Sequence, residues 1–322
     1  MRRRRLGWTD LEVSELSLGA MTFGTAMPPI STVDQRLARE MAERAIEAGV
    51  NLVDTADVYS SGESEEILAT VLRAHRGDLL VATKAGFGAA DSSRAGLSYD
   101  NVVRCAETSL QRLGIGHIDL FQLHRPDRSV PIEETLRALD DLVTRGLVRY
   151  WGVSNFTAAE MAYAMGWQDA HERPSIAAAQ VYYSLVGRDV EHEIVPFRIR
   201  RHVGLLVWSP LASGFLAGRE GGRRASFAFP PVDDVLGARA LDTMSAVADA
   251  HGTSAAQVAI AWLLGRPAVT SVIVGASTMA QLEDNLGATD LTLGDDEITR
   301  LDAATAPTPV YPAWWDAAMG VD

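Results

Sequence analysis

Four titratable side chains have the types needed to deliver a proton: Asp54, Tyr59, Lys84 and His124. A tyrosine is a weak acid at neutral pH, and a nearby ammonium lowers its pKa because the charge stabilises the tyrosinate. We expect Asp54 to hold Lys84 in place, and a neutral His124 ring to orient a carbonyl oxygen or assist proton transfer. Together they predict proton donation to an oxygen that gains negative charge. This chemistry fits carbonyl reduction with hydride from a cofactor.

Each of these residues also has an ordinary structural explanation when taken alone. Asp54 suits a turn or a helix cap, Tyr59 a surface loop, and His124 a hydrogen-bonded core position. Lys84 differs, because it is the single lysine in a chain with 28 arginines. A genome whose codon usage favours arginine explains the 28 arginines but not the single lysine. A site that needs a compact ammonium resists replacement by the planar guanidinium.

Eight short apolar runs would position these residues, and they alternate with amphipathic stretches. Their spacing, mostly about 25 to 40 residues, is that of βαβ units. Such alternation predicts a parallel sheet, and eight units favour a closed (β/α)8 TIM barrel. We expect residues 1–322 to form one domain, with an N-terminal hairpin over the barrel floor. The predicted strands are 16–20, 50–54, 79–83, 118–122, 149–153, 176–180, 205–208 and 269–274.

The stretches between the runs have the signals of helices. In residues 131–146, Pro131 suits the first helical position, and apolar residues follow at steps of three and four. Residues 64–75 and 254–264 show the same pattern, with Ser64 and Thr253 as candidate N-caps. These helices would cover the outside of the barrel.

Barrel active sites collect at the carboxyl ends of the strands. The residues that close each run are therefore the candidates for chemistry and for substrate contact. We expect Phe23, Met27, Phe87, Arg125 and Trp151 to line the substrate site. The aromatic tail residues have two open interpretations, packing or a wall of that site, and they are Tyr311, Trp314 and Trp315.

Composition excludes several classes of protein. The net charge of −13 argues against a nucleic-acid surface. The single cysteine, Cys105, excludes an intrachain disulfide and a paired-cysteine metal site, and fits a reducing, cytoplasmic compartment. The basic start is followed by polar residues, which is not typical of a secretory signal, and no apolar run is long enough for a membrane span. We expect no metal, because HxH and HExxH clusters are lacking.

The chain resembles the aldo-keto reductases from about Leu6 to Leu301, and is also similar to their channel beta-subunit branch. Seven ordered motifs carry the resemblance. They are Leu18-Gly-Ala-Met-Thr-Phe-Gly24, Asn51-Leu-Val-Asp-Thr-Ala-Asp-Val-Tyr59, Ala82-Thr-Lys84, Leu123-His-Arg-Pro-Asp127, Gly152-Val-Ser-Asn-Phe156, Trp208-Ser-Pro-Leu211, and Gly275-Ala-Ser277 leading to Gln281-Leu-Glu-Asp-Asn285.

The resemblance implies a catalytic group of Asp54, Tyr59, Lys84 and His124, and NADP(H) bound extended across the barrel mouth. The absence of a G-x-G-x-x-G fingerprint agrees with a cofactor that is not held in a Rossmann fold. The implied cofactor contacts are Gly19, Met21, Thr22, Asp54, Ser154, Asn155, Gln180 and Trp208 at the nicotinamide end, Ser209, Leu211, Ser213, Gly214 and Arg219 at the pyrophosphate, and Gly275, Ser277, Gln281, Asp284 and Asn285 at the 2′-phosphate end.

The choice between NADP and NAD depends on the 2′-phosphate end. Ser277 precedes a helical stretch, whose N-terminus suits an anion. The family often has a strongly basic residue where this chain has the neutral Gln281. NADP(H) is still expected over NAD(H), but Gln281 weakens the case for this preference. Arg219, Arg223 and Arg224 offer charge from a long loop, or else form its solvated face.

The sequence leaves three functions to compare. The leading hypothesis is reversible reduction of aldehydes or ketones, including sugar-like ones, by a monomer or homo-oligomer. The second is an NADPH-binding regulatory or partner subunit with weak reductase activity, as in relatives that serve membrane channels. A metal-dependent barrel hydrolase or isomerase using Asp54 and His124 ranks last.

Overall fold

Eight parallel strands close into a barrel in the computed structural model, which describes residues 1–88, 96–218 and 228–320. The order β10-β3-β4-β5-β6-β7-β8-β9 is circular, and every neighbouring pair is parallel. The predicted (β/α)8 barrel is thereby confirmed. The strands are β3 Leu16–Gly19, β4 Leu52–Asp54, β5 Leu80–Ala85, β6 Ile118–Leu123, β7 Val148–Ser154, β8 Ala178–Tyr182, β9 Gly204–Trp208 and β10 Ser271–Val274.

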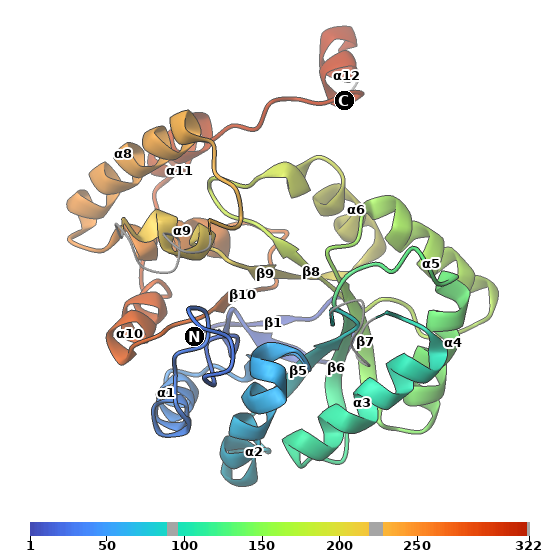
Figure 1. The fold of residues 1–322 in the computed structure, drawn as a ribbon. Helices are drawn as coiled ribbons and strands as arrows, with labels where there is room; N and C mark the ends of the chain where they lie inside the picture. Colours follow the sequence, from blue (N-terminus) through green and yellow to red (C-terminus); the bar gives the residue numbers. More distant parts are fainter. Residues whose placement is uncertain (89–95, 219–227, 321–322) are drawn as a thin grey trace.

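Helices surround the barrel, and the C-terminal helix stands apart from the others (Figure 1). The α-helices are α1 Gln35–Glu47, α2 Glu63–His75, α3 Tyr99–Leu113, α4 Ile132–Thr144, α5 Ala158–Ala170, α6 Ile194–Arg201, α8 Asp234–His251, α9 Ala255–Leu264, α10 Met279–Gly287, α11 Asp295–Ala304 and α12 Ala313–Met319. The 3₁₀ helices are η1 Tyr59–Gly62, η2 Asp189–Glu191 and η3 Ala212–Ala217.

The predicted hairpin consists of the antiparallel strands β1 (Arg3–Arg5) and β2 (Glu12–Ser14). Leu6, Leu11 and Val13 from this segment are buried in one cluster with apolar side chains from the barrel strands. The hairpin therefore closes the end of the barrel opposite to the strand carboxyl ends.

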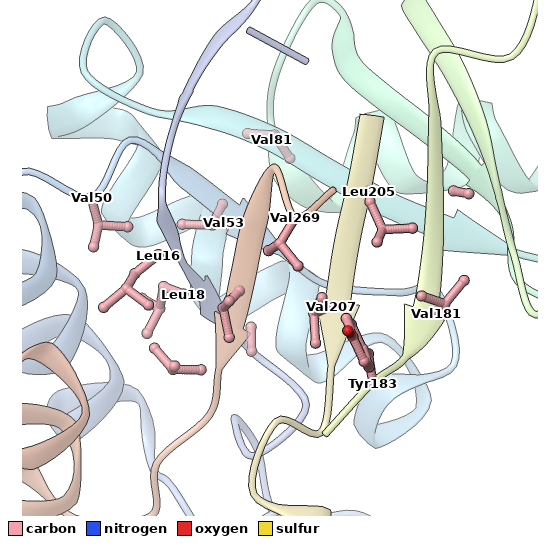
Figure 2. Packing of buried hydrophobic residues seen from close by; sticks show 14 of the residues in the cluster. Leu16, Leu18, Val50, Val53, Val81, Val181, Tyr183, Leu205, Val207 and Val269 are labelled. Carbon is pink, nitrogen blue, oxygen red and sulfur yellow. The ribbon is translucent and has the colours of Figure 1, made fainter. Parts of the chain in front are cut away.

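Alternate residues of each strand face two different cores. Val53, Val81 and Val207 belong to the large cluster between strands and helices, part of which is shown in Figure 2. Their neighbours Leu52, Ala82 and Leu206 belong to the smaller cluster with the hairpin. Since side chains of a strand alternate between its faces, the smaller cluster fills the barrel interior near the floor.

Three local expectations were wrong. Ser64 does not cap α2, because its hydroxyl bonds to Thr55 and to the carbonyl of Ala20, and the N-cap is Gly62. The N-cap of α9 is Ser254, which accepts from the Gln257 amide, rather than Thr253. Pro131 is the N-cap residue of α4 and not its first helical residue.

The expected substrate-lining residues separate into two groups. Phe23 and Trp151 are each 1% exposed and belong to the core between strands and helices, so their assignment to the substrate site was wrong. The Trp151 indole donates to the carbonyl of Pro174, which satisfies its polar atom within that core. Phe87 and Arg125 are exposed, and Met27 is half-buried. The tail residues Tyr311, Trp314 and Trp315 are exposed around α12 and do not belong to either core cluster.

Candidate active site

A polar layer lies directly above the apolar layer in the barrel interior, at the carboxyl ends of the strands. Along several strands, an apolar residue of the floor cluster is followed two positions later by a residue of this layer, which therefore faces the same interior. The pairs are Leu52 and Asp54, Ala82 and Lys84, Leu120 and Gln122, Ala178 and Gln180, and Leu206 and Trp208.

Lys84 is completely buried at the end of β5 and donates hydrogen bonds to three oxygens. Its Nζ lies 2.6 Å from Asp54 Oδ1, 2.8 Å from the carbonyl oxygen of Thr55 and 3.2 Å from Tyr59 Oη. A lysine ammonium has three donors, so this set satisfies all of them. The ammonium therefore has a fixed position between the carboxylate and the phenol, as the sequence predicted.

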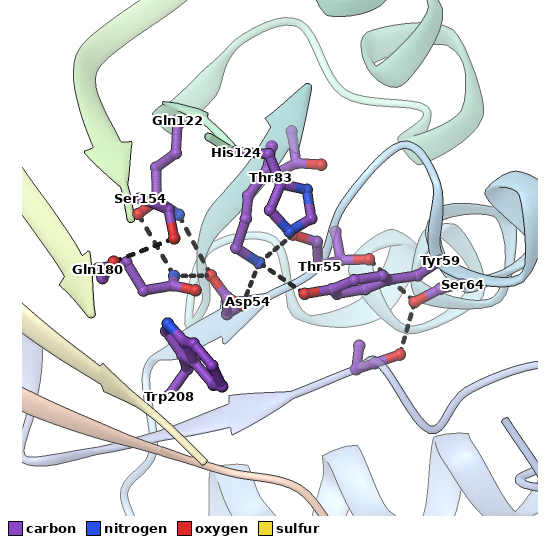
Figure 3. A network of polar contacts seen from close by, with 12 residues as sticks. Asp54, Thr55, Tyr59, Ser64, Thr83, Gln122, His124, Ser154, Gln180 and Trp208 are labelled. Carbon is purple, nitrogen blue, oxygen red and sulfur yellow. Dashed lines mark hydrogen bonds and ion pairs between the residues drawn. The ribbon is translucent and has the colours of Figure 1, made fainter. Parts of the chain in front are cut away.

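Asp54 is held from its other side by two amides (Figure 3). Its Oδ2 accepts from Gln180 Nε2 at 2.7 Å and from Gln122 Nε2 at 3.2 Å, and the two amides also bond to each other. Gln122 was not predicted as a site residue, because it lies within the apolar run of β6. Gln122 is two residues from both Leu120 and His124, so all three side chains lie on the same face of the strand. This two-residue alternation is the sequence signal by which Gln122 could have been predicted as a site residue.

Hydrogen bonds of the nearby Ser64 hydroxyl connect the loop that carries Tyr59 to the barrel. The hydroxyl of Ser64 joins Thr55 and the carbonyl of Ala20, which link this segment to the ends of β4 and β3. Ser60 and Ser61 take left-handed backbone angles, so the chain turns sharply directly after the tyrosine. The phenol is thereby directed back towards Lys84.

His124 follows β6 and lies beside Tyr59, with ring centroids 5.8 Å apart in an edge-to-face arrangement. Burial, followed by the positive charges of Lys84 and Arg125, holds the pKa of His124 well below its ordinary value of 6.5. The ring is therefore neutral at physiological pH. Its buried Nδ1 has no hydrogen-bond partner among the described residues.

The pKa of Tyr59 is shifted in the direction opposite to the one expected. Burial raises it above the ordinary value of 10.0, and the charge of Lys84 offsets this effect only in part. Burial also opposes the charge on Lys84, but Asp54 and Tyr59 outweigh it, so the pKa of the lysine is raised. At neutral pH the site therefore holds a neutral phenol beside a charged ammonium.

Amide and hydroxyl groups collect beside this centre at the ends of β7, β8 and β9. Asn155 Nδ2 donates to Ser154 Oγ at 3.0 Å and to the carbonyl oxygen of His124 at 3.0 Å. Its Oδ1 accepts from the indole of Trp208 at 3.2 Å. With Gln180 nearby, this donor set and the adjacent aromatic face suit a carboxamide attached to a flat ring.

The loop after β9 has an unusual backbone. Ser209, Ser213 and Gly214 all have positive φ, and Ser213 Oγ donates to the carbonyl of Phe229. Left-handed residues between right-handed ones form concave arrangements of amides that bind anions. Leu211 precedes η3 in this loop, whereas Arg219, Arg223 and Arg224 lie outside the described residues.

The end of β10 leads into α10, whose N-cap Thr278 accepts from the amide of Gln281. Gln281 Oε1 in turn accepts from the amide of Ser277. Asp284 faces α9, where its Oδ1 accepts from Ser254 and Gln257, and Asn285 donates to the carbonyl of Gly275.

On the neighbouring β3, Gly19 packs against Ile273. The loop that follows this strand contains Met21 and Thr22, and the hydroxyl of Thr22 donates to the carbonyl of Ala276.

The fold is a (β/α)8 barrel with a polar site at the carboxyl ends of its strands, and comparison with known proteins identifies the family. The family model described as Aldo/keto reductase family matches residues 15–306, so the chain belongs to this family. Membership supports an oxidoreductase that acts on carbonyl compounds.

Two kinds of relatives are similar over most of the chain. A probable voltage-gated potassium channel subunit beta of Arabidopsis thaliana is 35% identical, over 90% of this chain and 92% of the relative. An aldo-keto reductase of Fusarium vanettenii is 33% identical over 95% and 92%, and versiconal hemiacetal acetate reductase of Aspergillus parasiticus is 31% identical over 97% and 99%.

Neither a bilayer-spanning helix nor a metal-binding cluster occurs in the described residues. Among the described residues, no helix combines the length and hydropathy required to cross a bilayer. Within the same residues, histidine, cysteine, aspartate and glutamate side chains nowhere form a group of three that could hold a metal ion.

Proposed function

We propose that this chain reduces aldehydes or ketones to alcohols with NADPH, reversibly, and that Tyr59 is the general acid. The observation that carries this proposal is the position of Lys84 Nζ, 2.6 Å from Asp54 Oδ1 and 3.2 Å from Tyr59 Oη. A charged group fixed next to a phenol favours the phenolate that forms when the proton leaves. The raised pKa of Tyr59 keeps the phenol protonated until that moment.

The residues of the site divide the proton chemistry between them. Ser154, Asn155, Gln180 and Trp208 would hold a reduced nicotinamide, which would supply the hydride for the carbonyl carbon. Tyr59 Oη transfers its proton to the carbonyl oxygen, and Lys84 stabilises the resulting tyrosinate. His124, neutral because its pKa is lowered, donates a hydrogen bond that orients the carbonyl. Asp54 balances the lysine charge and is itself held by Gln122 and Gln180.

The cofactor assignment is supported by the chemistry of the groups around the barrel mouth. Ser154, Asn155 and Gln180 would hold the carboxamide, and Trp208 would stack on the ring. The loop after β9, with Ser209, Leu211, Ser213, Gly214 and Arg219, would hold the pyrophosphate. The β10–α10 segment would hold the adenosine end through its helix N-terminus; the residues proposed there are Gly275, Ser277, Gln281, Asp284 and Asn285.

The proton-donor role is tested with Tyr59→Phe, which removes one oxygen and keeps the ring. We expect kcat for aldehyde reduction to fall by about 100-fold or more, because general acid catalysis contributes factors of this size. NADPH binding, followed by quenching of tryptophan fluorescence, should be retained. Tyr150→Phe is the matched control, because Tyr150 bonds to Asp10 on the outside of the barrel floor. Wild-type turnover in Tyr59→Phe would contradict the assignment.

A second candidate is a regulatory or partner subunit that holds NADPH and turns over weakly. It is favoured by the similarity to a probable potassium-channel beta subunit at 35% identity. Burst kinetics separate the two functions. An enzyme oxidises many equivalents of NADPH per chain at a constant rate. A sensor subunit oxidises one equivalent and then releases the cofactor slowly. We expect multiple turnover, and a burst of a single equivalent would favour the second candidate.

A further inference from the structure

Arg125 places a positive charge beside the proposed reaction centre. It follows His124 directly, and its guanidinium carbon lies 5.1 Å from the centre of the Phe87 ring. The Phe87 ring is in turn 4.9 Å from the imidazole of His124. The Phe87 ring therefore lies beside both the guanidinium and the imidazole that is proposed to orient the carbonyl.

The charge of Arg125 is not neutralised by an ion pair within the described part of the chain, where no carboxylate oxygen within 4.0 Å of it is found. The acidic neighbour in its loop is Asp127, whose carboxylate accepts from the Leu97 amide and from Ser129. By contrast, Arg128 in the same loop is paired with Glu160 at 3.2 Å. Arg125 thus keeps its hydrogen-bond donors for another partner.

The surface of Phe87 supports the same interpretation. Its side chain is 49% exposed although it lies beside a buried catalytic centre. An aromatic ring that is partly stacked and partly open provides a flat apolar face for another ring. The chain as a whole has a net charge of −13, so it repels anions unless a local cation attracts them.

We propose that Arg125 and Phe87 select carbonyl substrates in which an aromatic ring separates the carbonyl from a carboxylate. The carbonyl oxygen lies between Tyr59 and His124, the substrate ring packs against Phe87, and the carboxylate binds the guanidinium. A guanidinium matches a carboxylate through two parallel hydrogen bonds, which makes this contact directional as well as attractive. The proposal rests on the reductase function proposed above and names its substrate class.

The test compares two substrates that differ only in charge, 4-carboxybenzaldehyde and its methyl ester. With Arg125→Met, which keeps an apolar stem on Phe87, we expect kcat/KM for the acid to fall about tenfold to a hundredfold, as for loss of a charged hydrogen bond. The value for the ester should fall much less than the value for the acid, because the ester has no carboxylate for the guanidinium to bind, so the acid-to-ester ratio of kcat/KM reports the charge contact. Arg125→Lys should recover part of the preference, and Arg128→Met is the control with a paired arginine in the same loop.

Ionic strength gives a second readout that a purely structural role does not move. In the wild type, the ratio of kcat/KM for acid over ester should fall as salt is added, because ions screen the guanidinium. In Arg125→Met the ratio should no longer fall as salt is added, because the cation that attracts the acid is gone. If the ester is reduced but the acid-to-ester ratio is the same in both proteins, the substrate class is wrong while the reductase function stands. If neither aldehyde is reduced, a panel of other carbonyls decides the function, and reduction of aliphatic aldehydes alone also overturns the substrate class.

Discussion

Lys84 connects the two groups on which the proposed proton transfer depends. Its ammonium donates hydrogen bonds to oxygens of Asp54, Thr55 and Tyr59, and its side chain is fully buried. A compact ammonium fits this space, whereas a planar guanidinium has a different shape and more donors. This requirement explains why a chain that uses arginine for every other cation retains one lysine.

Replacing Lys84 with Met should shift the pH dependence of the reverse reaction. In the proposed mechanism Tyr59 is the base for alcohol oxidation, so the rate of oxidation should rise as the phenol deprotonates. Lys84 lowers the pKa of Tyr59 against the larger effect of burial, so removing the lysine raises that pKa further. We therefore expect the rising limb of kcat/KM for alcohol oxidation to move to higher pH, with lower kcat in both directions. A limb that does not move would separate Lys84 from the titration of Tyr59.

His124 should make the protein less stable in mild acid. Its pKa in the folded state is well below 6.5, chiefly because of burial, whereas the unfolded chain takes up a proton near 6.5. Protonation therefore favours the unfolded state as the pH falls below about 6.5, with a slope of at most about 1.4 kcal/mol per pH unit for one group. Urea denaturation at several pH values should show a smaller loss of stability in His124→Asn than in wild type. Parallel pH profiles for the two proteins would contradict this expectation.

At the scale of the elements, one buried carboxylate on the helix after Tyr59 contacts both the strand carrying Lys84 and a neighbouring helix. Glu65 on α2 accepts from Thr83 on β5 at 2.7 Å and pairs with Arg112 on α3 at 3.2 Å. Arg112 also donates to the carbonyl of Asp57, and its guanidinium packs under Gly62. These contacts fix the relative position of α2, α3 and β5 behind the site.

Glu65→Gln should destabilise the fold by about 3 kcal/mol, because it leaves the charge of a largely buried arginine without a partner. The amide keeps the shape of the carboxylate and one acceptor for the Thr83 hydroxyl. The change in the free energy of unfolding therefore reports the loss of the negative charge. Glu40→Gln is the matched control, since Glu40 pairs with Arg36 on the exposed face of α1 and should cost at most about 0.5 kcal/mol. Urea denaturation measures both variants. Equal effects would show that burial does not strengthen the pair at Glu65.

The elements also show where sequence reasoning succeeded and where it failed. The strands were predictable because each is a short apolar run, and the residues that close them indicated Asp54 and Lys84. Gln122 was missed and Trp151 was misplaced for the same reason. The prediction did not work out which alternate residues of each strand face the barrel interior and which face the helices. Ser64 was taken as a cap because one of its true partners, the carbonyl of Ala20, lies just after a strand that is distant in the sequence. Tertiary contacts of this kind have no local signal in the sequence.

At the scale of the whole molecule, the barrel divides stability and chemistry between its two ends. The interior near the floor is filled by apolar side chains of the strands and of the hairpin, and the polar layer lies above it. Leu6 is fully buried in this lower layer and lies against Gly204, where a Cβ in place of the glycine hydrogen would come within 2.6 Å of Leu6 Cδ1. The floor is thus closely packed, and no residue of the proton-transfer site belongs to its cluster.

This separation predicts that a cavity in the floor affects stability without affecting catalysis. Leu6→Ala should lower the free energy of unfolding by about 3 kcal/mol, from lost apolar burial and the cavity left behind. Since the hydrogen bonds of Lys84 and Asp54 are unchanged, kcat/KM per folded molecule should stay within about twofold of wild type well below the melting temperature. Urea denaturation and steady-state kinetics on the same preparation measure both effects. A parallel loss of kcat would mean that the hairpin positions the polar layer as well as closing the barrel beneath it.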